Sequence, residues 1–305
     1  MRLVTYRRNQ EIHLGALLER QVVDVRRAYQ EYCRACGTGA PLEEHLASMM
    51  SLLAAGADVL DAVAAAIQWV HSEALKEDDR DSTQFEVSSV QLLPPLLNPG
   101  KILCIGGNYP AAGKLAAPDY PIVFLKPASG LTGPDMPIRV PAIATNVAYE
   151  VELVIVIGKR ARHVSKEEAR SSVAGYTMAN DLGDRILEKR TSQWTSGKMF
   201  DSFTPLGPAI VTPDELRDTH NLGMQTWVND QPVQRGCTAE MFFDADSLVS
   251  YLSALTTLEP GDIILTGSPK LMDGQPAPSV ALKPGDNVRI AVDGLGELVN
   301  PVEAE

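Results

Sequence analysis

The chain has 305 residues, of which 27 are Lys or Arg and 39 are Asp or Glu, so its formal net charge is −12. This acidic balance argues against a protein that binds nucleic acid or an anionic membrane, because both tasks need a basic surface. It leaves open the binding of hard metal cations, which prefer oxygen ligands. A hydrophobic content of 45% is ordinary for a globular protein with a sizeable core.

Neither a membrane span nor a secretory signal is predicted. The most apolar window, residues 51–70, contains Asp58 and Asp61, which are costly inside a bilayer, so an amphipathic helix is expected there. The basic first ten residues are not followed by an apolar stretch. The four cysteines are scattered and indicate reduced thiols in a cytoplasmic protein. Cys33 and Cys36 form a lone CxxC, for which a redox pair is the alternative interpretation.

Residues 1–95 are expected to form a small mixed α/β subdomain. Turn signals at Asn9 and at residues 19–20 separate three predicted strands, which cover residues 1–8, 11–19 and 21–28. Apolar residues at helical spacing predict helices over residues 29–37, 41–54 and 59–74. The charge run at residues 76–81 is interpreted as a solvated loop.

Residues 96–305 are expected to form a larger domain, entered through a Pro-rich connector. Its predicted strands are short and punctuated by Gly and Pro; they cover residues 101–109, 121–127, 151–159, 172–180, 207–213, 224–230, 262–267 and 287–292. This pattern favours an α+β fold that is mainly β, a barrel or sandwich, over a parallel α/β sheet. Helix-start signals occur at residues 165–168 and 212–215, and turn signatures at 259–262 and 283–286 each precede a strand.

The candidate functional residues of this domain are carboxylates. Glu150 and Glu152 are two residues apart at the start of a strand and therefore project from the same face. Two like charges beside an apolar run are costly unless something neutralises them, and a divalent cation does so directly. Asp181, at the end of another predicted strand, offers a third ligand for Mg²⁺ or Mn²⁺. The alternatives are a solvent-facing strand edge for the glutamates and a turn cap for Asp181.

The sequence resembles the fumarylacetoacetate hydrolase family. The resemblance rests on YEVELVIVIGK, GYTMANDLGDR, GKMFDSFTPLGP and LEPGDIILTGSP, in that order, with KILCIGGNY and FLKP upstream. It implies a β-rich, barrel-like catalytic domain with a small mixed α/β N-terminal subdomain, usually in a homodimer. It also implies binding of Mg²⁺ or Mn²⁺ and action on 2-oxo acids or 1,3-dicarbonyl acids. The family's reactions include C–C hydrolysis, decarboxylation and keto–enol isomerisation.

The resemblance carries over to individual positions. It implies metal ligation by Glu150, Glu152 and Asp181, the same residues singled out above. It implies catalytic roles for Arg185 in the NDxxxR motif, Lys198 in GKMFD, and Glu188. The positions implied in substrate binding are Asn108, Tyr109, Lys126, Thr266, Gly267 and Ser268, the last of which replaces a threonine by another hydroxyl residue.

The sequence also departs from the family pattern. After the G-x-N-Y motif, the His and Glu that activate water in the family's hydrolases are replaced by Ala112 and Leu115. This argues against the usual hydrolytic step but leaves enolate chemistry untouched. Glu188 stands where the family often has Gln, and Asp184 precedes Arg185. If both carboxylates line the pocket, less acidic substrates than dicarboxylates are expected; the alternative is that both face solvent.

Three hypotheses follow for the function. The first is a Mg²⁺- or Mn²⁺-dependent hydrolase that cleaves a C–C bond in an acylpyruvate or 1,3-dicarbonyl acid, with Lys198, Glu188 or Asp184 replacing the missing base. The second is an isomerase or decarboxylase of a 2-oxo acid, which needs a stabilised enolate but no activated water. The third is a non-catalytic ligand-binding relative. In each, the partner is a small oxo acid or diketone, not a nucleic acid or a membrane.

Overall fold

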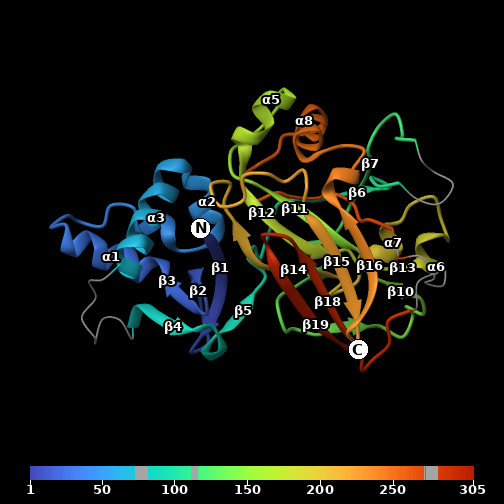
Figure 1. The fold of residues 1–305 in the computed structure, drawn as a ribbon, viewed down its shortest axis with the longest axis horizontal. Helices are drawn as coiled ribbons and strands as arrows, with labels where there is room; N and C mark the ends of the chain where they lie inside the picture. Colours follow the sequence, from blue (N-terminus) through green and yellow to red (C-terminus); the bar gives the residue numbers. More distant parts are fainter. Residues whose placement is uncertain (73–81, 111–115, 271, 273–280) are drawn as a thin grey trace.

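The computed structural model describes residues 1–72, 82–110, 116–270, 272 and 281–305. The predicted loop at 76–81 lies outside these residues, as do the end of the predicted helix 59–74 and the two departures at Ala112 and Leu115. In Figure 1 the N-terminal part, in blue, lies beside the larger part that carries most of the strands.

The N-terminal part is a meander of strands with helices packed against it (Figure 1). The strands are β1 (Arg2–Arg8), β2 (Glu11–Leu18), β3 (Gln21–Asp24), β4 (Gln84–Glu86) and β5 (Gln91–Leu93). The helices are α1 (Val25–Ala35), α2 (Met49–Ala55) and α3 (Ala57–Ser72), with 3₁₀ turns at Glu43–Leu46 and Val87–Ser89. The predicted turns are confirmed, because Asn9 and Glu19 both have positive φ angles between paired strands.

Two N-terminal predictions are wrong in part. The strand expected over residues 21–28 ends at Asp24, whose carboxylate accepts the Arg27 amide at 2.9 Å and starts α1. Such a cap satisfies a helix amide that has no partner within the helix. The helix expected over residues 41–54 is a 3₁₀ turn followed by α2, because Ser48 forms a capping box with Ser51 and begins a separate helix.

The largest sheet joins the two parts of the molecule. Its main path runs β4-β3-β2-β1-β14-β12-β11-β17-β6-β7. The strands beyond β1 are β6 (Ile102–Gly106), β7 (Ile122–Leu125), β11 (Val151–Ile157), β12 (Val173–Asn180), β14 (Thr204–Val211) and β17 (Ile263–Leu265). Since β1 pairs with β14, backbone hydrogen bonds cross the boundary predicted at residue 95; independent folding of residues 1–95 stays a prediction.

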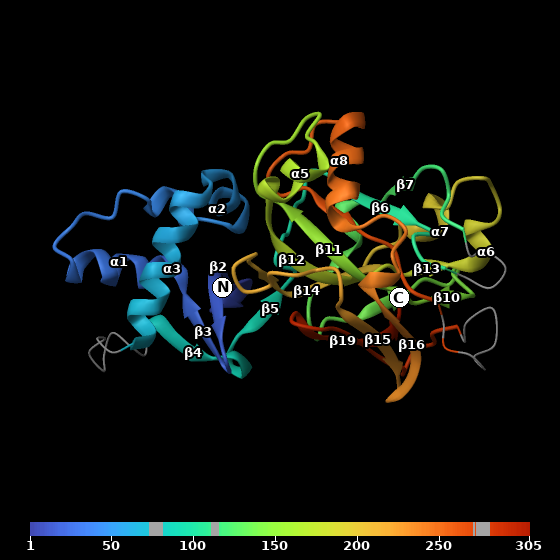
Figure 2. The ribbon, with the colours of Figure 1, turned by 45° about the horizontal axis from the view of Figure 1, so that its top comes forward.

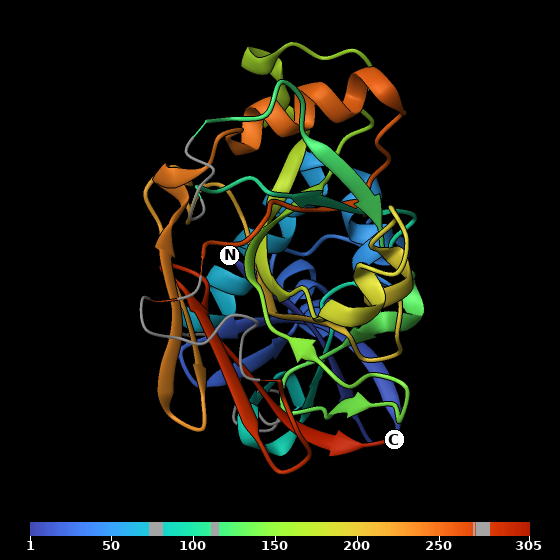
Figure 3. The ribbon, with the colours of Figure 1, turned by 90° about the vertical axis from the view of Figure 1, so that its right-hand side faces the viewer.

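A second sheet has the order β16-β15-β18-β19-β9. Its strands are β16 (Gln231–Cys237), β15 (Gly223–Val228), β18 (Asn287–Val292), β19 (Gly296–Ala304) and β9 (Ile138–Val140). In Figure 3 the orange and red strands of this sheet run beside the yellow-green strands of the first sheet, which curve around the centre of the view. The expected strand-rich α+β fold is confirmed, and the turns at 259–262 and 283–286 precede β17 and β18 as predicted.

Short elements complete this part. They are β8 (Leu131–Thr132), β10 (Val147–Ala148), β13 (Gly183–Asp184), α5 (Lys166–Ala169), α6 (Arg185–Glu188), α7 (Thr195–Lys198) and α8 (Ala245–Leu255), with 3₁₀ turns at Ala128–Gly130, Arg170–Ser172 and Thr238–Glu240. The predicted capping box confirms the start of α5, where Ser165 and Glu168 exchange hydrogen bonds. Figure 2 shows α5 and α8 lying side by side on one side of β11 and β12.

The helix expected at residues 212–215 is a turn. The hydroxyl of Thr212, which would have capped it, instead accepts a hydrogen bond from the amino group of Met1 at 2.6 Å. Glu215 forms an ion pair with Arg2 at 2.6 Å. These contacts tie the segment to β1, and the backbone makes a single turn.

Strand β11 lies between two hydrophobic cores. Leu153, Ile155 and Ile157 belong to a core shared with the second sheet and α8. Val154 and Val156 point the other way, into a core shared with the N-terminal helices. All of β11 is buried, so this strand is a rigid support for the residues at its start.

None of the described helices alone is long and apolar enough to cross a membrane. Helices α2 and α3, bent by 119° at the break between them, pass the length and composition test only when they are taken together.

Candidate active site

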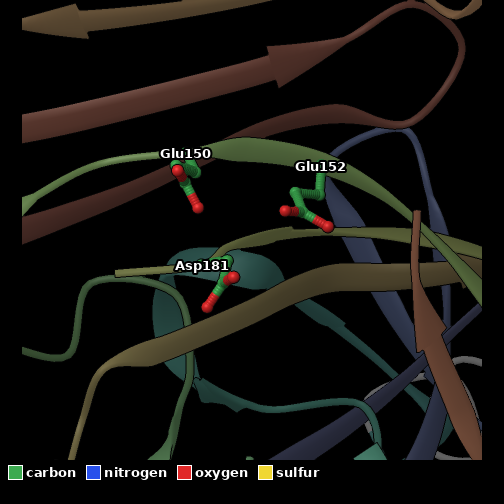
Figure 4. A group of neighbouring side chains, drawn as sticks. All are labelled: Glu150, Glu152 and Asp181. Carbon is green, nitrogen blue, oxygen red and sulfur yellow. The ribbon is translucent and has the colours of Figure 1, made fainter. Parts of the chain in front are cut away.

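The three predicted metal ligands come together at the start of β11 and the end of β12. Each of Glu150, Glu152 and Asp181 offers one carboxylate oxygen, and these oxygens lie within 4.8 Å of one another (Figure 4). Pairing of the two strands explains the approach, because the Asp181 amide donates to the Glu150 carbonyl at 2.8 Å, one step beyond the Val151–Asn180 pair. Tertiary structure therefore confirms the predicted cluster.

Burial and mutual repulsion set the electrostatics of this cluster. Glu152 is 2% exposed and Asp181 1% exposed, and Glu150 lies at the cavity edge. Burial, together with the negative charges of Asp181 and Glu150, raises the pKa of Glu152 well above its ordinary value. Burial alone would also raise the pKa of Glu150, but the neighbouring Arg185 and Lys198 outweigh it and lower this pKa to about 2.

Two buried lysines neutralise Asp181. Lys126 donates to Asp181 Oδ1 at 2.5 Å and to the carbonyls of Leu182 and Phe203 at 2.9 and 2.8 Å. Lys198 donates to Asp181 Oδ2 at 2.7 Å, to the Asp181 carbonyl at 2.9 Å and to Glu150 Oε2 at 2.5 Å. Burial lowers the pKa of Lys198, but Asp181 and Glu150 raise it by more, so this lysine is held in its charged form.

Arg185 and Glu188 form a second charged pair at the start and end of α6. The guanidinium of Arg185 bonds Glu150 Oε1 and donates to Glu188 Oε2 at 2.9 Å. Glu188 is 5% exposed, and its other oxygen, Oε1, has no hydrogen-bond partner among the described residues. That oxygen lies 3.9 Å from Lys198 Nζ.

The hypothesis that both extra carboxylates line the pocket is correct for Glu188 and wrong for Asp184. Asp184 is fully buried and accepts the amides of Asn146, Ile186 and Leu187 at 2.6, 3.0 and 2.8 Å. Its carboxylate is therefore the N-cap of α6. This role fixes the direction of Arg185, the first residue of that helix.

The turn after β17 supports the acidic cluster from the other side. Gly267 has a φ of +94°, and its amide donates to Glu152 Oε2 at 2.7 Å. A Cβ at this position would lie 2.8 Å from Asn108 Cβ, so the close approach requires glycine. The hydroxyl of Thr266 donates to the Leu153 carbonyl at 2.9 Å, which ties the turn to β11.

Beside the cluster lies a cavity of about 500 Å³. The predicted site residues that line it are Tyr109, Glu150, Glu152, Asp181, Arg185, Glu188, Lys198 and Ser268. Asn108, Lys126, Thr266 and Gly267 are not among the described lining residues. Asn108, for example, bonds the backbone at Thr266 and Phe243. Their predicted contact with substrate stays a prediction.

Sequence reasoning missed several lining residues. Gln234 accepts the Val151 amide at 3.1 Å and donates to Ser268 Oγ at 2.7 Å, so it joins the second sheet to the site. Phe124 and Trp194 form an edge-on aromatic wall with ring centroids 5.7 Å apart. A signal for Phe124 was available, since it begins the FLKP motif. Gln234 and Trp194 stand in no motif that sequence reasoning used.

The donor set fits a hard divalent cation. All three clustered side chains offer carboxylate oxygens, the ligands that Mg²⁺ and Mn²⁺ prefer. Glu152 accepts one backbone amide, and no cationic side chain among the described residues bonds it, although it is buried beside two further carboxylates. A cation at the cluster would remove the repulsion that raises its pKa.

Known proteins are similar to most of this chain. The family described as "Fumarylacetoacetate (FAA) hydrolase C-terminal" matches residues 101–303. The oxaloacetate tautomerase fahd2, mitochondrial, of Xenopus laevis is 44% identical over 70% of this chain and 69% of its own. The human oxaloacetate tautomerase FAHD2A, mitochondrial, is 40% identical over 70% of each chain. The fumarylacetoacetate hydrolase domain-containing protein 2 homolog of Dictyostelium discoideum is 37% identical over 99% of this chain and 97% of its own.

Solved structures extend the similarity to the whole chain. A fumarylacetoacetate hydrolase from Exiguobacterium antarcticum matches with a TM-score of 0.79 and 29% identity, and covers 100% of both chains. A maleylpyruvate hydrolase from Sphingobium, in complex with manganese(II) and pyruvate, matches with a TM-score of 0.76 and 28% identity, covering 100% of this chain and 99% of its own. The motifs, the acidic cluster, the fold and these similarities agree, and the chain belongs to the fumarylacetoacetate hydrolase family.

Proposed function

We propose that this protein interconverts the enol and keto forms of a 2-oxo dicarboxylic acid such as oxaloacetate. Glu150, Glu152 and Asp181 would hold the Mg²⁺ or Mn²⁺ ion. The observation that carries the proposal is a cluster of three carboxylates, two of them buried, that lines a cavity, with Lys198 and Arg185 bonded to it. The relatives named oxaloacetate tautomerase support the choice of substrate.

The missing His–Glu pair supports tautomerisation over hydrolysis. Enol–keto exchange moves a proton between C3 and the 2-oxo oxygen and consumes no water, so no water-activating base is needed. Ala112 and Leu115 stand where the family's hydrolases carry that base. The reaction therefore asks only for groups that bind the acid, stabilise charge on its oxygen and exchange protons.

The side chains divide this work between them. A divalent cation would withdraw electrons from the 2-oxo group and make the neighbouring C–H more acidic. Arg185 and Lys198, both charged and both at the cavity, would bind the carboxylate and the oxygen on which negative charge develops. Glu188 holds the Arg185 guanidinium in place. Two residues are candidates for the base that exchanges the proton at C3. One is Glu188, and the other is Lys198, which would first have to release a proton of its ammonium group.

The charges at the cavity support a dianionic substrate. Its described lining includes four carboxylates and four cationic side chains, which balance. A divalent ion would add two positive charges at the acidic cluster, which favours a substrate that carries two carboxylates. The alternative expectation from sequence, a monoanionic acid or neutral diketone, assumed that Asp184 also faces the pocket.

The test is the rate at which the Mg²⁺- or Mn²⁺-loaded protein converts enol-oxaloacetate to the keto form, followed by loss of enol absorbance. We expect acceleration that disappears in Asp181→Asn and persists in Glu167→Gln, a change on the exposed face of α5. The same assay with a neutral β-diketone decides between the two substrate classes. No acceleration by the loaded wild-type protein would overturn the proposal.

A C–C hydrolase is the second candidate, and the size of the cavity favours it. About 500 Å³ is more than a four-carbon acid needs, and the manganese-bound structural relative is named as a maleylpyruvate hydrolase. Lys198 and Glu188 remain candidates for the substitute base, whereas the capping role of Asp184 removes it. Release of pyruvate from acylpyruvates would favour this function, and CO₂ release from oxaloacetate would favour decarboxylation.

Two further expectations belong to the same proposal. A homodimer is expected from the family resemblance, and sedimentation velocity of the purified chain tests it. The cytoplasmic location expected from the cysteines competes with the mitochondrial location in the names of several relatives. Imaging of the tagged full-length protein in its own cells decides between them.

A further inference from the structure

Lys198 occupies the position of a cation in the structure. Its ammonium bridges two of the three predicted metal ligands, with Nζ 2.5 Å from Glu150 Oε2 and 2.7 Å from Asp181 Oδ2. Its side chain is 3% exposed, and its three donors have three acceptors, namely these two carboxylate oxygens and the Asp181 carbonyl. Ammonium and metal ion compete for the same oxygens, and a cation bound by Glu150 and Asp181 would weaken both bonds.

Lys126 and Lys198 differ in the hydrogen bonds that each would keep when a cation binds to Glu150 and Asp181. Lys126 bonds one oxygen of Asp181 and also two backbone carbonyls, at 2.8 and 2.9 Å. Lys198 would keep only the carbonyl of Asp181 itself, at 2.9 Å. A buried ammonium with one of its three donors satisfied is costly, so Lys198 needs another acceptor.

Glu188 offers that acceptor. Its Oε1 lies 3.9 Å from Lys198 Nζ and has no hydrogen-bond partner among the described residues, although the side chain is 7% exposed. A movement of about 1 Å would bring Nζ within hydrogen-bond distance. Arg185 already bonds the other oxygen, Oε2, at 2.9 Å and holds the carboxylate in place. Gly183 packs against Oε1, and a Cβ on this residue would lie 2.1 Å from that oxygen.

We propose that Glu188 is a positioning residue that takes over the ammonium of Lys198 when a divalent cation binds. In the metal-free site Lys198 neutralises Glu150 and Asp181. In the loaded site it turns to Glu188 Oε1, which leaves the ligand oxygens to the cation and keeps the ammonium at the cavity. The inference rests on the metal site of the proposed function but not on which reaction the site catalyses.

The test measures Mn²⁺ affinity by calorimetry on the full chain, with the metal alone as the probe. Glu188→Leu, which removes the acceptor, should weaken Mn²⁺ binding about tenfold, the usual effect of losing a group that orients a metal site. Glu188→Gln keeps an acceptor oxygen without the charge and should fall between Glu188→Leu and the wild type. An affinity of Glu188→Leu within twofold of the wild type would overturn the inference.

A double-mutant cycle separates this role from simple loss of a negative charge. In a Lys198→Met background no ammonium needs a new partner, so Glu188→Leu should weaken Mn²⁺ binding less than in the wild type, by only the part that acts through Arg185. An equal loss in both backgrounds would show that Glu188 acts only through its charge or through Arg185, and would overturn the inference.

A crystal structure of the wild-type protein with Mn²⁺ gives a reading that needs no variant. Lys198 Nζ at hydrogen-bond distance from Glu188 Oε1 supports the exchange, and Nζ still bridging Glu150 and Asp181 overturns it. If the wild type does not bind Mn²⁺ at all, the metal site fails together with this inference. Mn²⁺ binding without catalysis removes only the proposed reaction.

Discussion

The N-terminal layer and the acidic site bury polar groups in opposite ways. In the N-terminal layer the buried Asp24 accepts the Tyr6 hydroxyl at 2.6 Å and the Arg27 amide at 2.9 Å, and no other acid lies beside it among the described contacts. At the site, Glu150, Glu152 and Asp181 crowd within 4.8 Å. Hydrogen bonds compensate the single charge of Asp24, whereas the three clustered carboxylates of the site need a bound cation to balance their repulsion.

This difference teaches where stability and function reside. The N-terminal helices are held by apolar side chains such as Leu52 and Leu53, which are fully or almost fully buried. The acidic site is held by Lys126, Lys198 and Arg185, whose positive charges neutralise its carboxylates. Changes in the first region should therefore alter folding without altering metal binding, and changes in the second should do the reverse.

The largest expected effect is on the site. Asp181→Asn keeps the size of the side chain but replaces one of its two acceptor oxygens by an NH2 donor and removes the charge that a cation requires. We expect Mn²⁺ affinity to fall about a hundredfold, ~2.7 kcal/mol, and turnover to fall about a thousandfold. Calorimetry and the enol-oxaloacetate assay measure these losses. Near-normal Mn²⁺ binding by this variant would contradict the assignment of Asp181 as a ligand.

The matched change in the N-terminal layer should lower stability and leave metal affinity unchanged. Leu52 is 0% exposed, and Leu52→Ala should lower the free energy of unfolding by about 2–5 kcal/mol through lost burial and a cavity. Denaturant titration measures this loss. Mn²⁺ affinity of the folded protein should stay within twofold of the wild type, and a large drop would show that the two regions are coupled.

Metal addition tests the comparison without a variant. Binding only to the folded state stabilises it by ~2.7 kcal/mol when the free ion is at 100 times its Kd. Thermal unfolding of the wild-type protein should therefore shift upward with Mn²⁺ and return after chelation. The same titration on Asp181→Asn should show almost no shift, and an equal shift would mean that the ion binds elsewhere.

The aromatic wall of the cavity, formed by Phe124 and Trp194, can be disturbed through the neighbouring Gly106. A Cβ on Gly106 would lie 2.1 Å from the Trp194 ring, so Gly106→Ala should push the tryptophan from its place. Overpacking of this kind costs about 1–3 kcal/mol. We expect turnover to fall more than Mn²⁺ affinity, because the wall lines the cavity but does not touch the ligands. Comparison of kcat, KM and metal Kd checks this.

The smallest effect is expected at a helix cap far from the site. Ser48 accepts the Ser51 amide at 3.1 Å and begins α2. Ser48→Ala should cost about 1 kcal/mol of stability and leave turnover unchanged. Equilibrium unfolding and the activity assay, run on the same preparation, measure both quantities.

Local chemistry made much of the fold and site predictable. The apolar run of β11, the capping box at Ser165 and the Pro-Gly turns before β17 and β18 depend on neighbouring residues, so sequence patterns located them. Glu150 and Glu152 share a face because of strand geometry alone. The helix predicted from Thr212 failed because its capping hydroxyl bonds Met1, which lies far away in the sequence.

By itself the sequence singled out the side chains that the proposed function uses: three carboxylates, a lysine and an arginine in recognisable motifs. Only the tertiary structure decided how they are paired. Asp184 and Glu188 look alike in sequence, yet one caps α6 and the other faces the cavity with an oxygen near Lys198. Gln234 enters the site from the second sheet. Such assignments depend on contacts between distant segments, and burial then sets the cost of each unpaired charge.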